Sequence, residues 1–104
     1  MAFADNLKAL PAVAHLAALE LSDATGQITA RIENKPGQAG SLAVYAALAA
    51  KHGSINPAAA AEGLAIYAEH TADARANPGK HPNIDRLIGI TTPAQTLSVR
   101  LIAA

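Results

Sequence analysis

The chain has 104 residues, no cysteine and a formal net charge of zero at pH 7, with a pI near 6.9. Such a charge balance argues against nucleic-acid binding, which needs a basic surface. The lack of cysteine excludes disulfides, thiolate chemistry and Cys-ligated zinc. No run of apolar residues reaches the roughly 20 needed to span a bilayer, and the opening MAFADNLKAL is not typical of a signal peptide. We therefore expect a cytoplasmic protein that forms one domain over residues 1–104.

The composition predicts a core of small aliphatic side chains. Hydrophobic residues make up 51% of the chain, but aromatic residues only 3%. Each buried alanine removes little area from water, at about 25 cal/mol per Å² of apolar surface. Self-association would bury more of that surface, so we expect a homo-oligomer.

The first half of the chain begins with a short helix and a β-hairpin. Asp5 can cap a helix that Pro11 ends. Apolar and polar residues alternate from Val13 to Leu21 and again from Ile28 to Glu33. A turn with glycine, Asp23–Gly26, separates the two runs. One face of this hairpin is apolar and the other polar, which is typical of a sheet covered on one side.

A helix is expected to begin at Ala39 or Ser41 and to end at His52, because Gly53 is a common helix terminator. Its sequence is apolar nearly all round. Such a helix is buried on several sides or lies at an interface. We therefore place the expected homodimer contact on Leu42–Leu48.

A second long helix is expected after Asn56, which is a good N-cap, with Pro57 at the first helical position. The pattern continues to about Ala74, and Asn77–Gly79 ends it. A short helical turn is expected to end near Ile88.

The last element is a strand, because apolar and polar residues alternate from Leu97 to Ile102. The order is then short helix, hairpin, two helices, loop and strand. This order predicts an α+β fold with a three-stranded, mainly antiparallel sheet, built from the N-terminal hairpin and the C-terminal strand, and two main helices on one face.

The segment Tyr67–Arg86 holds two of the four histidines together with three acidic and three basic residues. Imidazole and carboxylate groups together suit zinc, manganese or iron, so a divalent metal is one hypothesis. No His-x-x-x-His or His-Glu-x-x-His spacing is present. In the alternative reading, one histidine packs at the helix edge and the other forms a hydrogen bond in a stiff loop. The candidate metal ligands are His70, His81 and Asp85, with Glu69 or Asp73.

The same segment suits acid/base chemistry. A histidine beside Glu69 or Asp85 could transfer protons near neutral pH. Lys80 and Arg86 could hold an anionic substrate, the arginine in bidentate fashion. The alternative is a surface loop with ordinary ion pairs.

A third candidate is the loop Lys35–Ser41. A glycine-bearing loop that leads into a helix exposes backbone N–H groups to an anion, and Lys35 adds a positive charge. Gly37 and Ser41 would contact the ligand. The loop lacks the spacing of a P-loop, and the alternative is a simple strand-to-helix turn.

Two resemblances follow from particular stretches. The stretch from Ile32 to Asn56, with its Pro36-Gly37 turn and alanine-rich helix, resembles the opening of an ACT domain. That likeness implies amino-acid sensing near the turn, at a dimer interface, and a strand after Asn56. Helical residues after Asn56 would contradict the resemblance. The chain as a whole resembles a small family of uncharacterised bacterial proteins, through the stretches ENKPG, GSLAVY, AEHT and PGKHPNIDRL.

These observations leave two classes of function open. The leading hypothesis is a module that binds a small ligand or a protein partner without catalysis, because no catalytic motif is present. The second is a small metal-dependent or acid/base enzyme that uses His70, His81 and Asp85. No cofactor is firmly implied beyond that possible divalent metal.

Overall fold

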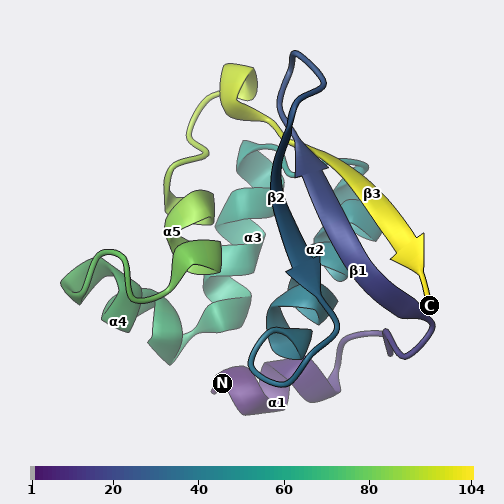
Figure 1. Ribbon diagram of the computed structural model, residues 1–104. Coiled ribbons are helices and arrows are strands. Elements are labelled where there is room, and N and C mark those ends of the chain that lie inside the picture. Colours follow the sequence, from purple (N-terminus) through teal and green to yellow (C-terminus); the bar gives the residue numbers. More distant parts are fainter. Residues whose placement is uncertain (1) are drawn as a thin grey trace.

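The structure, a computed structural model, describes residues 2–104. Helix α2 packs on one face of a three-stranded sheet, α3 packs against α2, and α5 packs against α3 (Figure 1). The expected α+β fold is confirmed. Its elements in chain order are α1 (Phe3–Lys8), β1 (Leu16–Ser22), β2 (Ile28–Glu33), α2 (Ala39–His52), α3 (Pro57–Tyr67), α4 (Glu69–Ala76), α5 (Pro82–Ile88), the 3₁₀ turn η1 (Pro93–Gln95) and β3 (Ser98–Ala103).

The sheet has the order β2-β1-β3, and both pairs of strands are antiparallel. The central strand places Leu19 opposite Ile32 on one side and opposite Leu101 on the other. In the hairpin turn, the Asp23 carboxylate accepts hydrogen bonds from the backbone N–H groups of Thr25 and Gln27. The turn chemistry that the sequence showed therefore sets the hairpin.

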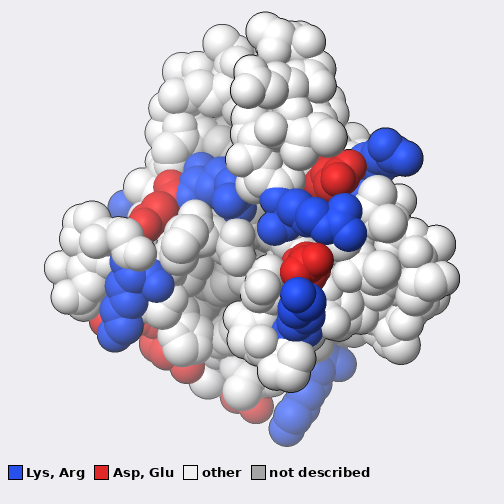
Figure 2. Space-filling view, viewed as in Figure 1, with Lys and Arg blue, Asp and Glu red and all other residues white. Residues whose placement is uncertain are grey.

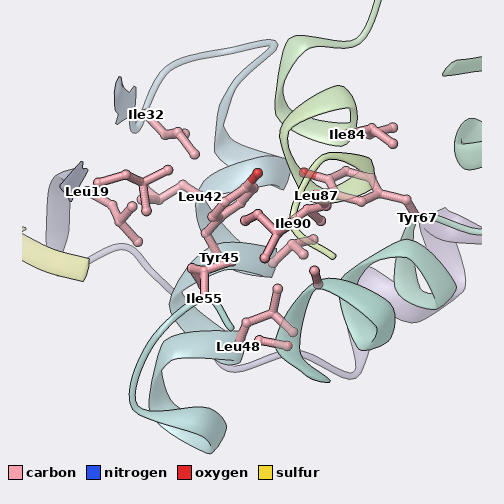
Figure 3. Close-up of a cluster of buried hydrophobic side chains, with 14 of the residues drawn as sticks. Leu19, Ile32, Leu42, Tyr45, Leu48, Ile55, Tyr67, Ile84, Leu87 and Ile90 are labelled. Atoms are coloured by element: carbon pink, nitrogen blue, oxygen red, sulfur yellow. The ribbon is translucent and has the colours of Figure 1, made fainter. Parts of the chain in front are cut away.

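Helix α2 is apolar on several sides because it lies between the sheet and α3. Its four largest apolar residues, Leu42, Val44, Tyr45 and Leu48, are fully buried inside the chain. Figure 3 shows three of them in one cluster with side chains from the sheet and from α5. The apolar stripe is thus used within the chain and is no free surface for a dimer contact. The expectation of a homo-oligomer itself stays a prediction.

The alanine-rich stretch expected to form one helix forms two, α3 and α4, with a break at Ala68. This residue has φ 51° and ψ −116°, a backbone conformation that residues with a Cβ rarely adopt. The Thr71 hydroxyl donates to the carbonyl of Leu64 (2.7 Å), and the Asn6 side chain donates to the carbonyl of Ile66 (2.9 Å). A side chain of α4 and one from α1, 60 residues away, thus satisfy carbonyl groups that the break leaves free, and helical periodicity cannot reveal this.

Helix α3 begins at Pro57, and the Asn56 side chain accepts a hydrogen bond from the N–H of Ala59 (2.8 Å). The predicted cap is therefore confirmed. The ACT resemblance required a strand at this point, so that interpretation is removed. The predicted closing strand is also present, although Leu97 lies before it and forms an isolated bridge with Ile55.

Acidic and basic side chains lie beside one another on the face that Figure 2 shows, and neither sign gathers into a broad patch. Two of the pairs on β2 are Arg31 with Glu20 (3.1 Å) and Lys35 with Glu33 (2.7 Å). Within residues 2–104, no helix has both the length and the apolar character to cross a membrane.

Candidate functional site

A cavity of about 260 Å³ lies where α1, the start of α2, α4 and the start of α5 meet. Gly37 and Ser41 line it from the loop and first turn of α2, and His70, Lys80 and His81 line it from the opposite side. The two segments that the sequence singled out separately, Lys35–Ser41 and Tyr67–Arg86, thus form one pocket.

One side of the pocket consists of aromatic rings. The ring of Phe3 stacks on Tyr67, with 5.1 Å between centroids, and meets His70 edge-on at 5.2 Å. The rings of His70 and His81 follow, with centroids 5.8 Å apart. Such a series offers flat faces and ring edges on which a planar ligand can pack.

Behind this wall, one carboxylate binds an ammonium group and an imidazole ring. Oδ2 of Asp73 lies 2.6 Å from Nε2 of His81 and 3.0 Å from Nζ of Lys80. The hydrogen bond from His81, and then the one from Lys80, lowers the pKa of Asp73 to about 2. An ionised carboxylate only accepts hydrogen bonds, so Nε2 of His81 carries a proton, and Nδ1 is the nitrogen left for a ligand.

Two hydroxyl groups meet on the α2 side of the pocket. Tyr67 is nearly fully buried, and its hydroxyl donates to Oγ of Ser41 (2.7 Å). Burial raises the pKa of Tyr67 far above its usual range, so the phenol stays neutral and keeps its proton. Because Ser41 accepts in this bond, its own proton is free to be donated to a ligand.

Asp85 is engaged away from the two imidazoles. Its Oδ2 accepts a hydrogen bond from the N–H of Gly79 (2.9 Å), which fixes the turn before α5. Within residues 2–104, no group of three or more His, Asp or Glu side chains is arranged to hold a metal ion. The metal hypothesis therefore stays a prediction that rests on His70 and His81.

Two further residues predicted to hold an anion have other partners. Arg86 donates to the side chain of Asn83 (2.8 Å) and to the hydroxyl of Tyr45 (3.2 Å), so it joins α5 to α2. Lys35 pairs with Glu33 on the sheet. Of the predicted anion-holding cations, the pocket wall contains Lys80.

Sequence reasoning missed Phe3, because only the folded chain shows that α1 lies against Tyr67. A second Lys-His pair also went unnoticed. Lys51 and His52, at the end of α2, both bind Oε1 of Glu62, at 2.9 and 3.1 Å. This triad repeats the arrangement around Asp73 but does not line the pocket. The ion arrangement alone therefore does not mark a site; its position beside a cavity does.

A family model described as "Uncharacterized protein conserved in bacteria (DUF2322)" matches residues 3–101. Searches among curated proteins and among solved structures gave no match.

Proposed function

The chain belongs to this family of conserved bacterial proteins, and we propose that it is a cytoplasmic module that binds a small organic anion in the pocket without transforming it. One observation carries the proposal. The wall holds the ammonium group of Lys80 and the imidazoles of His70 and His81, and no Asp or Glu is among the lining residues that the structure describes. A ligand with negative charge is the natural complement of such a wall.

The start of α2 adds to this preference. Residues in the first turn of a helix have backbone N–H groups without intrahelical partners, and these attract anions. The N-cap Gln38 makes no side-chain cap here, and the N–H of Ala39 donates to the carbonyl of Lys35, so the N–H groups of Gly40 and Ser41 are the ones that can face a ligand. Gly37 has φ 88° and nothing near its missing side chain, so a ligand can approach the backbone closely.

The size of the pocket limits the ligand. Pockets for drug-sized molecules measure roughly 300–1,000 Å³. At about 260 Å³, this one suits a smaller molecule, and its ring-lined side favours a flat one. A small aromatic or unsaturated carboxylate meets all three conditions.

The test is a titration of the purified protein with a panel of benzoate-like and short unsaturated carboxylates, followed by ¹H–¹⁵N NMR. We expect shift changes at the amides of residues 37–41, 70, 80, 81, 83 and 84. Lys80→Ala should weaken binding about tenfold, since a hydrogen bond to a charged group contributes on the order of that factor.

Lys51→Ala is the matched control, because Lys51 forms the same ion pair with a glutamate away from the pocket. It should leave the affinity unchanged. The proposal is wrong if no carboxylate of the panel binds at millimolar concentration, or if the shifts map elsewhere.

A second candidate function rests on the short contact between His81 and Asp73 at the pocket wall. A carboxylate that orients a histidine is a common element of general acid/base catalysis. In this reading Asp73, rather than Asp85, is the partner of the catalytic histidine.

The two functions differ in what happens to a bound ligand. An enzyme would convert a ligand found by the titration, and His81→Ala would slow the conversion by roughly 10²–10⁴-fold while His52→Ala would not. A ligand that stays unchanged over days favours the binding module.

A further inference from the structure

The two edges of the sheet are finished differently. On the β2 edge, the N–H of Glu33 donates to the side chain of Gln38 (3.1 Å), which covers part of that edge. On the β3 edge, Leu97 and Ile55 exchange two backbone hydrogen bonds, at 2.9 and 3.1 Å. Beyond Leu97, no described residue bonds to the outer side of β3, which lies at the open border of the sheet in Figure 1.

The direction of the free backbone groups follows from this bridge. Because the N–H and C=O of Leu97 point away from β1, the two-residue period of a strand points those of Val99, Leu101 and Ala103 the same way. Arg100 and its even-numbered neighbours face β1 instead, where Arg100 is opposite Glu20. Such an open row of donors and acceptors is a template for another strand.

The same edge carries an exposed apolar side chain beside an apolar groove. Leu101 is 49% exposed, one of two large hydrophobic residues in the described chain with such exposure. It borders a groove of about 150 Å³ whose wall includes Ala46, Ala47 and Ala50 of α2. A second leucine placed next to Leu101 would fill this space.

We propose that β3 pairs with β3 of a second copy of this chain, antiparallel and with the two-fold axis through Leu101, to form a continuous six-stranded sheet. In this register Leu101 faces its copy, and Val99 faces Ala103 of the partner. All three outward-pointing residues then form hydrogen-bonded pairs. Both leucines lie on the helix side of the sheet, over the two grooves.

Charge selects this register among the pairings of two copies. With the two-fold axis at Arg100, that residue would lie directly opposite Arg100 of the second copy. Like charges opposite one another destabilise a sheet. With the axis at Leu101, Arg100 is opposite Ile102 instead. The bridge between Leu97 and Ile55 lies outside the paired stretch and is preserved.

The first test is sedimentation of the wild-type protein and of two variants over a range of concentrations. We expect a dimer for wild type and at least a tenfold weaker association for Leu101→Lys, which puts two charges at the axis. Ile28→Lys is the matched control, because Ile28 is the other exposed large hydrophobic residue, at 54%. It should leave the dimer intact, and circular dichroism checks that both variants fold.

The second test determines which residues of the two β3 strands are paired. Because the chain has no cysteine, a single introduced cysteine is the only thiol that can cross-link. In a hydrogen-bonded antiparallel pair the Cα atoms lie about 5.5 Å apart, within the range that a disulfide spans. Leu101→Cys should therefore cross-link into covalent dimers under mild oxidation, and Ile28→Cys should not. A wild-type protein that is monomeric at all concentrations, a dimer that survives Leu101→Lys, or equal cross-linking of both cysteine variants would overturn the proposal.

Discussion

Lys80 and His81 both contact the same carboxylate oxygen of Asp73, Oδ2. Which of the two lowers the pKa of Asp73 more can be measured. The hydrogen bond from His81 is the largest cause of its lowered pKa, with Lys80 second. We therefore predict that ¹³C NMR will give a carboxyl titration midpoint of about 2. His81→Ala should raise this pKa more than Lys80→Ala does. An equal effect of the two variants would contradict this order.

The same carboxylate makes stability depend on pH in a defined window. The pKa of Asp73 is lower in the folded state than its ordinary value of 3.8, so folding favours the ionised form. Its contribution to stability is complete above about pH 4 and is lost as the pH falls towards 2. We predict that Asp73→Asn will reduce the decrease in thermal stability between pH 4 and pH 2. An unchanged acid profile would show that Asp73 is not linked to folding.

The backbone conformation of the single residue Ala68 separates two elements, α3 and α4. A residue with a Cβ in such a conformation costs about 1–3 kcal/mol. We predict that Ala68→Gly will stabilise the protein by about 1 kcal/mol, or roughly 4–8 °C in Tm. Ala65→Gly, in the regular part of α3, is the control and should destabilise by about 1 kcal/mol. A lower Tm for both variants would mean that Ala68 is not strained.

At the scale of elements, Gly63 allows α3 to approach its neighbours. A Cβ added there would lie 2.7 Å from Leu87 and 2.9 Å from Leu48, and both leucines are fully buried. We predict that Gly63→Ala will destabilise the protein, because overpacking costs about 1–3 kcal/mol while helix propensity returns about 1. Thermal unfolding of Gly40→Ala is the control, since its added Cβ would meet Phe3 and Leu7 at ordinary distances. That variant should be as stable as wild type or more so.

Local sequence patterns predicted the helices and strands well, but they could not predict features that depend on contacts between distant residues. Alternation and turn residues located the hairpin, and Asn56 with Pro57 located the start of α3. The break at Ala68 was missed because Asn6 stabilises it from 60 residues away in the chain. The pocket was predicted only as two separate segments, since nothing in either stretch indicates that α1 brings Phe3 against Tyr67.

At the scale of the whole molecule, the apolar core and the surface ion pairs contribute very differently. The lysines of three pairs, Lys35, Lys51 and Lys80, are 60–65% exposed, and exposed pairs contribute little to stability. Leu42 is fully buried between the sheet and the helices. Removing such a side chain costs about 2–5 kcal/mol, out of the roughly 5–15 that hold a domain of this kind folded.

We therefore predict that thermal unfolding will show a small effect of salt and a large effect of Leu42→Ala. Raising NaCl from roughly 0.02 M to 0.5 M screens the exposed pairs and should move Tm by only a few degrees. Leu42→Ala should lower it by at least about 8 °C. If salt lowered Tm as much as Leu42→Ala does, ion pairs would hold the fold together, and neither Lys80→Ala nor its control Lys51→Ala could be used without destabilising the protein.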